Sequence, residues 1–254
     1  MSQQSQNILA QNSLPENPSI VILTGAGISA ESGIETFRDQ GGFWENYRIE
    51  DVASPEAFRQ SPDKVHEFYN MRRRQLTDET IKPNKAHEAL ARLTHKLEDK
   101  VLLVTQNVDN LLERAGGNGI LHMHGELMKI RCVNCAHVCP WNKDIFADTK
   151  CPNCRVEGHL RPHIVWFGEI PFGLEMIYRA LSNCDLFVAI GTSGAVYPAS
   201  GFIQDARQSN CDRTVEINPE RTEISAFFYE IITGPATETV PEFVDELIKS
   251  GKYT

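Results

Sequence analysis

The feature that most constrains the fold is a short apolar run ending in a glycine-rich turn. Residues 20–23 (IVIL) predict a buried strand, and residues 25–30 (GAGISA) follow at once. In this G-x-G-x-x-A pattern a helix begins directly after a strand, and its N-terminal N–H groups can bind a pyrophosphate. Gly25 permits the tight turn, Gly27 lets the backbone approach phosphates, and Ala30 lets the helix pack closely on the strand. Glycines after a strand also form ordinary turns, so the residues that follow are needed to distinguish a phosphate-binding loop from a simple turn.

The residues after this turn argue against an ordinary dehydrogenase. Residues 32–44 continue as a polar, glycine-rich loop, which is typical of a segment that closes on a ligand. A dehydrogenase also places an Asp or Glu after its second strand to hold the adenosine ribose. Here the next strong strand, 101–104, lies far beyond that spacing and leads into two amides and a carboxylate, Gln106, Asn107 and Asp109. Hydride transfer is therefore disfavoured.

Four of the seven cysteines form two CxxC pairs, which fifteen residues separate. Four thiolates can bind one tetrahedral zinc ion at about 2.3 Å each and leave no open position, so the predicted site is structural. Redox pairing is the alternative, but thioredoxin-like CxxC motifs occur singly at a helix start. The predicted zinc ligands are Cys132, Cys135, Cys151 and Cys154, and Cys139, Cys184 and Cys211 are interpreted as ordinary thiols.

Capping signals and alternating patterns predict an α/β fold. Ser54-Pro55 and Ser61-Pro62 predict helices over 55–60 and 62–76, and Asn84 predicts the N-cap of a helix over 84–97. Strands and helices alternate beyond it, which predicts a parallel sheet with helices on both faces. The expected elements are strands 101–105, 185–190, 214–217 and 228–232, and helices near 109–115, 198–208 and 239–249.

The predicted architecture is a Rossmann-like parallel sheet with a smaller domain made of a helical insertion and a zinc-binding module. Residues 1–18, rich in Gln, Asn and Ser, are expected to form a flexible tail before one catalytic domain, 19–254. Within that domain the expected parts are a core (19–38, 84–127 and 161–254), a helical insertion (39–83) and a zinc module (128–160).

Composition narrows the function classes. A hydrophobic content of 41% and a charged content of 23% are ordinary for a soluble globular enzyme. The net charge of −9 does not favour nucleic acid. No apolar run approaches the roughly 18 residues of a membrane span, and the N-terminus has no signal-peptide pattern. With cysteines in metal-type pairs, these features predict a cytoplasmic protein that binds neither nucleic acid nor membrane.

Several motifs occur together in one order: GAGIS, AESGI, TFR, TQNVDNLLERAG, HGEL, two CxxC pairs and GTS followed by VYPA. From about Ser19 to the C-terminus the chain resembles the sirtuins, the family of NAD-dependent protein-lysine deacylases. It is most similar to the bacterial, CobB-like, class III members. The resemblance implies NAD and one structural zinc ion as cofactors, and a substrate cleft between the core and the insertions.

The resemblance also implies a mechanism. In the family the acyl-lysine oxygen attacks the ribose carbon that carries nicotinamide, and a histidine then helps deprotonate a ribose hydroxyl, which captures the acyl carbon. The products are nicotinamide, free lysine and O-acyl-ADP-ribose. The histidine of the HG motif is His124, with Asn107 and Asp109 as further catalytic residues. By spacing alone His124 is more simply a packed side chain, and His122 and His163 are nearly equal candidates.

The cofactor residues follow mainly from the resemblance. Gln106, Asn107 and Asp109 correspond to the residues around the nicotinamide ribose and amide, although a polar turn with Asp109 as N-cap is an alternative. The end of strand 185–190 is expected to face phosphate and ribose, as in other open α/β sheets. The full expected set is Gly25, Ala26, Gly27, Ile28, Ala30, Thr36, Phe37, Arg38, Trp44, Gln106, Asn107, Val108, Asp109, Gly191, Thr192, Ser193, Asn218, Pro219, Glu220 and Ala236.

Tyr69 and Arg72 are the expected acyl-recognition pair. In the family this Tyr-x-x-Arg pair marks members that remove succinyl and malonyl groups, so the chain is expected to be a deacetylase and a desuccinylase or demalonylase. A guanidinium can clamp a carboxylate and a phenol can add a hydrogen bond. A solvated basic helix face is the alternative for Arg72-Arg73-Arg74. By resemblance, acylated lysines of protein substrates bind along Val165, Trp166, Phe167 and Gly168 as an added strand.

Two residues depart from the family pattern. Glu35 replaces a proline in the cofactor loop, and Leu112 replaces a histidine, which is expected to remove a polar contact near the ribose. Two rival functions remain open. One is mono-ADP-ribosyl transfer to protein, which uses the same cofactor cleavage, and the other is a non-catalytic NAD-binding, zinc-ribbon interaction module.

Overall fold

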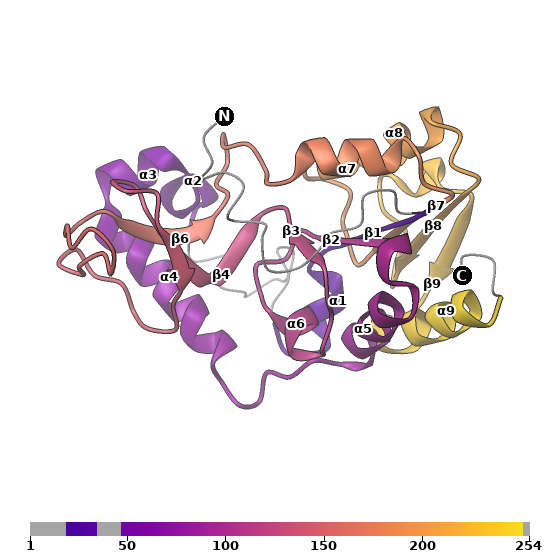
Figure 1. Cartoon of the computed structure of the whole chain (residues 1–254), viewed down its shortest axis with the longest axis horizontal. Coiled ribbons are helices and arrows are strands. Elements are labelled where there is room, and N and C mark those ends of the chain that lie inside the picture. The colour runs from indigo at the N-terminus through magenta and orange to yellow at the C-terminus, as the bar shows by residue number, and fades with distance from the viewer. Residues whose placement is uncertain (1–18, 35–46, 251–254) are drawn as a thin grey trace.

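The computed structural model describes residues 19–34 and 47–250, and its centre is a six-stranded sheet (Figure 1). The strand order is β3-β2-β1-β7-β8-β9, and every neighbouring pair is parallel. The predicted parallel α/β sheet is therefore confirmed. Its strands are β1 (Ile20–Thr24), β2 (Val101–Thr105), β3 (Ile120–His122), β7 (Leu186–Ile190), β8 (Arg213–Asn218) and β9 (Glu230–Thr233).

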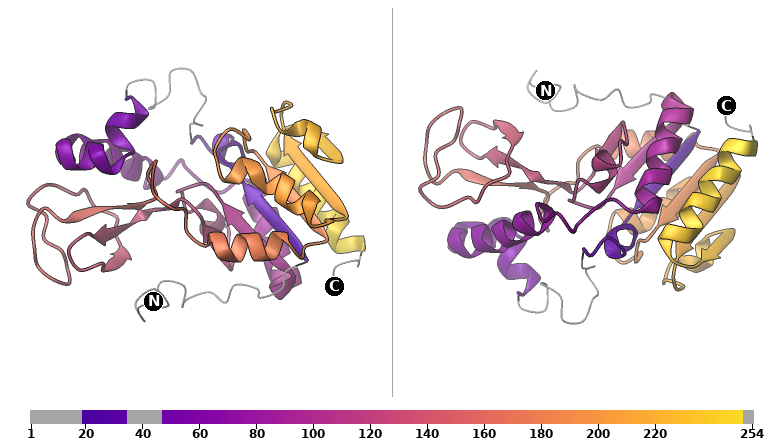
Figure 2. Two further views of the ribbon diagram at one scale, coloured as in Figure 1. Left: turned by 90° about the horizontal axis from the view of Figure 1, so that it is seen from above. Right: turned by 90° about the horizontal axis from the view of Figure 1, so that it is seen from below.

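Helices cover both faces of this sheet (Figure 2). Helices α5 (Lys85–Leu97) and α9 (Ala236–Ser250) lie on one face, and α7 (Leu174–Leu181) and α8 (Phe202–Gln208) lie on the other. Successive β1 side chains point to opposite faces: Ile20 and Ile22 pack with α5 and α9, whereas Val21 and Leu23 pack with α7 and α8. Burial on both faces explains why residues 20–23 of β1 are all apolar.

A second lobe packs helices against a small antiparallel sheet. Its helices are α2 (Ile49–Val52), α3 (Pro55–Gln60) and α4 (Pro62–Leu76). The sheet has the order β5-β4-β6, with β4 at Gly125–Cys132, β5 at Val138–Pro140 and β6 at Leu160–Ile164. One apolar cluster joins the two parts and includes Phe68 and Tyr69 of α4, Leu127 of β4, and Trp166. In Figure 1 this lobe lies on the left, beside the main sheet.

The capping predictions gave mixed results. The Ser54 hydroxyl accepts from the Ala57 N–H at 3.0 Å, and the Asn84 side chain accepts from Ala86 and His87 at the start of α5, so both caps are confirmed. Ser61 is the N-cap residue of α4 and Pro62 begins the helix, as predicted, although the Ser61 side chain makes no cap bond. The helix expected near 109–115 is the shorter α6 (Leu111–Arg114), and α1 is a single turn (Gly27–Ala30).

Helix α7 and strand β3 were not expected from the sequence. Short 3₁₀ turns occupy Glu98–Lys100, Ala199–Gly201 and Ser225–Phe227. The C-terminal helix begins three residues earlier than predicted and contains Pro241. Among the described residues, no helix is both long and apolar enough to cross a membrane. The tail predicted over 1–18 lies outside the described residues.

Candidate functional site

The site forms where the connections leave the sheet in opposite directions. Strand β1 pairs with β2 on one side and with β7 on the other, so the loops after β1 and β7 flank a topological switch point. Open α/β sheets bind ligands at this position, outside the carboxyl ends of the strands. The two loops contact each other: Gly25 N–H donates to Ile190 O at 2.9 Å, and Gly27 N–H donates to Gly191 O at 2.8 Å.

Glycine is required in these two loops because their backbones touch. A Cβ on Gly25 would lie 2.7 Å from the Gly191 oxygen, and one on Gly27 would lie 2.7 Å from the Gly191 Cα. The close approach of Gly27 to phosphates stays a prediction, and its described contact is with Gly191 in the loop after β7. The packing argument for Ala30 is wrong, because Ala30 is exposed at the end of α1 and does not lie between helix and strand.

A buried hydrogen-bond network holds Asn107 and Asp109 beside the first loop. Asn107 Nδ2 donates to Ser29 Oγ at 3.1 Å, and Ser29 Oγ donates to Asp109 Oδ2 at 3.0 Å. His87 Nε2 lies 3.3 Å from the same Oγ. Since His87 Nδ1 accepts from the Asn84 N–H, and burial lowers the His87 pKa to about 4, its one proton sits on Nε2 and points to Ser29.

Sequence reasoning missed Ser29 and His87 as supporting residues. Ser29 lies inside the glycine motif, and His87 stands three residues after the helix cap, where it was indistinguishable from a surface histidine. Burial raises the Asp109 pKa, while bonds from Leu111 N–H and Ser29 oppose this shift. The N-cap residue of α6 is Asn110, so the N-cap predicted at Asp109 is wrong by one residue, although Asp109 Oδ1 accepts from the Leu111 N–H at 3.0 Å. The other carboxylate oxygen of Asp109 accepts from Ser29 in the loop after β1.

The histidines differ in the atoms they leave available. His122 Nδ1 lies 3.2 Å from Asn107 O, and Nε2 lies 2.6 Å from Glu113 Oε1, so each ring nitrogen already faces an oxygen of the protein. Burial opposes charge on both groups, but their shared hydrogen bond outweighs it, raising the His122 pKa and lowering the Glu113 pKa. Both His122 nitrogens are therefore engaged within the protein, and neither is available to a substrate.

His124 keeps a lone pair at the site. Its Nδ1 lies 3.1 Å from the Gln106 carbonyl, which can only accept, so Nδ1 carries the proton and Nε2 keeps the lone pair. Burial lowers the His124 pKa below its ordinary value, so the ring is neutral near pH 7. His163, in contrast, is only 4% exposed and stacks on Phe172 at 4.9 Å. The geometry therefore favours His124 as the base.

The other predicted cofactor residues are distributed along the same sheet edge. Gln106 Nε2 donates to Thr192 Oγ1 at 2.9 Å, and Asn218 Nδ2 donates to Thr192 O at 3.1 Å, so three strand ends are joined. Ile28 is fully buried, and Ala236 is the buried first residue of α9. Ala26, Val108, Gly191 and Ser193 are half-buried, whereas Pro219 and Glu220 are exposed.

The structure does not describe the expected cofactor loop around Arg38, but it does place Leu112. Thr36, Phe37, Arg38, Trp44 and the departure at Glu35 lie outside the described residues. Leu112 is 3% exposed and packs in the apolar cluster under α5. The Leu112 side chain thus lies in an apolar environment, and the loss of a polar contact near the ribose stays a prediction.

The two residues expected to recognise the acyl group, Tyr69 and Arg72, lie on α4 in different environments. Tyr69 is 4% exposed, and its hydroxyl accepts from the Trp166 indole N–H at 2.9 Å. Arg72 is half-buried, with its guanidinium carbon 5.7 Å from the Phe68 ring centre. The two side chains are three residues apart and share one helix face.

The solvated basic face offered as the alternative is wrong. Arg73 is 1% exposed and donates to Leu127 O and to Asn70 Oδ1, and Arg74 pairs with Asp144 at 2.9 Å. Burial lowers the Arg73 pKa to about 10. These arginines fasten α4 to the small sheet and its loop, so each of the three has a different role.

The expected peptide strip is exposed only in part. Val165 N–H donates to His124 O at 2.9 Å, and Phe167 N–H donates to Ala53 O at 3.0 Å, so both amides already bond within the protein. Phe167 is 54% exposed and Gly168 is also exposed, whereas the Trp166 side chain is buried behind the strip. A peptide can therefore reach Phe167 and Gly168 directly, but not the Trp166 ring.

The four predicted zinc ligands converge on one point. Their sulfurs all lie within 4.8 Å of one another, and Cys132–Cys154 and Cys135–Cys151 are each 3.7 Å apart. Four sulfurs at 2.3 Å from one ion in a tetrahedron are about 3.8 Å apart, so the cluster fits a structural zinc ion. Both short contacts join different CxxC turns, which disfavours redox pairing inside each turn.

The two CxxC turns have the same backbone geometry. In each, the residue after the second cysteine is left-handed (Ala136, φ 58°; Arg155, φ 65°) and donates its N–H to the carbonyl of the first cysteine. Amide side chains reach the sulfurs: Asn153 Nδ2 donates to Cys135 and Asn134 Nδ2 donates to Cys154, both at 3.5 Å. Such donors stabilise thiolates, the form that binds zinc.

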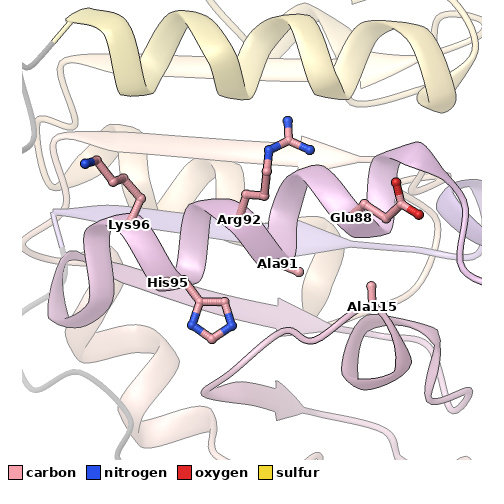
Figure 3. Close-up of a pocket in the computed structure, with 6 residues that line it drawn as sticks. All are labelled: Glu88, Ala91, Arg92, His95, Lys96 and Ala115. Atoms are coloured by element: carbon pink, nitrogen blue, oxygen red, sulfur yellow. The ribbon is translucent and has the colours of Figure 1, made fainter.

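An open hollow elsewhere on α5 is separate from these residues (Figure 3). It is lined by Glu88, Ala91, Arg92, His95, Lys96 and Ala115, none of which was predicted for the site. Two of its polar side chains have partners: Arg92 pairs with Asp245 at 3.2 Å, and the His95 ring bonds to Gly116 O at 2.7 Å.

Comparison with known proteins agrees with this geometry. Residues 25–198 match the family model described as the Sir2 family. The chain is 54% identical over 234 residues to the NAD-dependent protein deacylase of Salmonella typhimurium, covering 92% of this chain and 85% of that protein. It is 53% identical over 237 residues to the Escherichia coli protein of that name, covering 93% and 85%.

Solved structures are similar over nearly the whole chain. A Sir2 homologue bound to NAD superposes with a TM-score of 0.81 at 35% identity, covering 98% of this chain and 95% of that one. A mutant Sir2 homologue bound to ADP-ribose gives a TM-score of 0.82 at 35% identity, with 98% of both chains covered.

Proposed function

The chain belongs to the Sir2 family, and we propose that it is an NAD-dependent protein-lysine deacylase that transfers the acyl group to ADP-ribose. The observation that carries this proposal is the His124 ring, whose Nδ1–H bonds to Gln106 O while Nε2 keeps its lone pair at the switch point of the sheet. Both nitrogens of His122 already face protein oxygens and His163 is buried, so neither ring offers such an atom.

The chain's own residues supply orientation and a proton acceptor. NAD, when bound, supplies the ribose that receives the acyl group and the nicotinamide that leaves. His124 Nε2 accepts the proton of the attacking hydroxyl, as a neutral imidazole can near pH 7. Ser29 and His87 hold Asn107 and Asp109 in fixed orientations. The zinc cysteines hold the small sheet and take no part in proton transfer.

The test is direct. Purified protein is mixed with NAD and with matched acetyl-lysine and succinyl-lysine peptides, and O-acyl-ADP-ribose is quantified by mass spectrometry. We expect acyl-ADP-ribose from the wild type and its loss in His124→Ala. His95→Ala, in the hollow on α5, is the matched control and should retain activity. Absence of the product from the wild type would refute the proposal, and labelled ADP-ribose on protein would favour ADP-ribosyl transfer instead.

We further propose that Tyr69 and Arg72 recognise acidic acyl groups. Support comes from their shared face on α4, from a buried phenol, and from a guanidinium placed near it. Arg72→Met should lower kcat/KM for succinyl-lysine by about 10-fold to 100-fold, since a hydrogen-bonded charge is worth about 1.5–3 kcal/mol. Acetyl-lysine turnover should change little. Arg74→Met is the matched control, and equal losses on both peptides would contradict this assignment.

The remaining assignments belong to the same proposal. Acylated proteins are the expected partners, and direct nucleic-acid binding is not expected for a chain with net charge −9. A cytoplasmic location is supported by the cysteine cluster, because thiolates bind zinc only while they stay reduced.

A further inference from the structure

The Tyr69 hydroxyl accepts a hydrogen bond from the Trp166 side chain. The indole Nε1–H donates to the phenol oxygen at 2.9 Å, and the ring centres lie 6.3 Å apart. An indole N–H can only donate, so this bond uses a lone pair and leaves the phenolic proton for another acceptor. Burial raises the Tyr69 pKa to about 12, so the hydroxyl keeps its proton at cellular pH. Tyr69 therefore presents a hydrogen-bond donor.

The Trp166 ring is itself held in one orientation. It is 2% exposed, and the Arg161 guanidinium carbon lies 3.2 Å from the ring centre. Phe58 packs on it at 5.4 Å between ring centres. The Trp166 backbone N–H donates to Glu169 Oε2 at 2.8 Å. Packing and a cation–π contact thus fix the direction of the indole N–H.

Glu169 anchors this arrangement from the loop after the peptide strip. Arg161 binds its carboxylate through two bonds, of 2.7 Å and 2.9 Å, and Arg131 Nη2 adds a third at 2.9 Å. Burial opposes the charge on Glu169, but these bonds and the Trp166 N–H outweigh it and lower the Glu169 pKa. Glu169 is therefore a carboxylate at neutral pH, and the Arg161 planar fork stays bound to it.

We propose that Trp166 determines specificity for acidic acyl groups as a positioning residue acting through Tyr69. Its N–H occupies the acceptor side of the phenol, so the phenolic proton is directed to the carboxylate of a succinyl or malonyl group. Arg161 and Glu169 hold the indole in that orientation. An acetyl group has no such carboxylate, so its removal does not depend on this bond. This inference rests on the proposed deacylase function and deepens it.

A double-mutant cycle tests the inference. We would measure kcat/KM on matched acetyl-lysine and succinyl-lysine peptides for the wild type, Trp166→Phe, Tyr69→Phe and the double variant. Each single change should lower the succinyl-to-acetyl ratio about tenfold, and the double variant should fall no further than Tyr69→Phe. Both substrates are measured on one preparation, so a partly misfolded fraction cancels from the ratio.

The control is Trp141→Phe, which removes the indole that donates to Asp144 O at 3.4 Å in the zinc module and should leave the ratio unchanged. Multiplying losses in the double variant would overturn the inference, because Trp166 would then act independently of Tyr69. Should Trp166→Phe be too inactive to assay, Glu169→Gln replaces it, and an unchanged ratio there would also overturn it. Wild-type protein that forms no O-acyl-ADP-ribose would instead refute the proposed function itself.

Discussion

Two causes require glycine at position 191: its left-handed backbone and its contact with the loop after β1. Replacing Gly191 with alanine should reveal both as a loss of stability. Gly191 has φ +61°, and a Cβ there would lie 2.6 Å from Ile28 N and 2.8 Å from Gly27 C. A left-handed alanine costs about 1–2 kcal/mol. Forcing an extra carbon into a packed site adds about 1–3 kcal/mol. Gly191→Ala should therefore lower the free energy of unfolding by about 2–5 kcal/mol.

Gly116→Ala supplies the matched control. Gly116 also has a positive φ, +91°, but no atom lies within 4 Å of a Cβ built there. It should therefore lose only the conformational part, about 1–2 kcal/mol. Urea unfolding followed by circular dichroism measures both losses. The contact between the two glycine loops would be refuted if Gly191→Ala lost no more stability than Gly116→Ala.

Functional measurements give a second readout of Gly191→Ala. Pushing the loop after β7 away from Gly27 moves both walls of the crevice in which we propose that NAD binds. The KM for NAD should rise at least tenfold, whereas Gly116→Ala should leave it unchanged. Unaltered NAD kinetics in Gly191→Ala would place the cofactor away from this contact.

Three further predictions follow from the site and its supports. Folding raises the His122 pKa, so the stabilisation from His122 is complete below its ordinary pKa of 6.5 and is lost as the pH rises through its pKa in the folded protein. Folding lowers the Glu113 pKa, so the stabilisation from Glu113 is present above its ordinary pKa of 4.5 and is lost as the pH falls through its pKa in the folded protein. Glu113→Gln should therefore lower the free energy of unfolding most between pH 4.5 and 6.5, and a pH-independent loss would contradict the pairing. Because burial lowers the His124 pKa, the acid limb of kcat should lie below pH 6.5; a limb at higher pH would exclude His124 as the base. Cys132→Ser should abolish metal content, measured by atomic absorption, and deacylation with it, whereas Cys139→Ser in the same module should retain both.

Local signals carried much of the fold. The helix predicted over 62–76 has those bounds in the structure, and Asn84 caps α5, because proline at a first turn and an amide at a cap act within a few residues. The cysteine spacing likewise predicted a cluster that the structure brings together. Helix α7 was missed, since the sequence argument relied on cap signals and α7 follows Gly173, which makes no side-chain cap bond.

Tertiary partners decided what local patterns could not. His122 and His124 have nearly the same sequence context, but their partners differ. Both nitrogens of His122 face protein oxygens, whereas the bond described for His124 joins Nδ1 to the Gln106 carbonyl. Arg73 stands in a run of three arginines, yet it is buried because its acceptors come from Asn70 and from the distant Leu127. Leu112 packs in an apolar cluster whose members are mostly distant in the sequence, so its surroundings could not be predicted locally.

The small antiparallel sheet connects the predicted zinc site to the residues around His124. Strand β4 starts directly after His124 and ends at Cys132, where it pairs with Leu160; β6 then returns to Ile164, which pairs with Gly125 and precedes the peptide strip. A zinc ion bound at one end would hold the register of two strands whose other ends adjoin His124, the proposed base, and the proposed peptide strip. The six-stranded sheet has its own apolar clusters on both faces. Zinc shortage in a cell is therefore expected to produce molecules that still capture dinucleotide but do not turn it over.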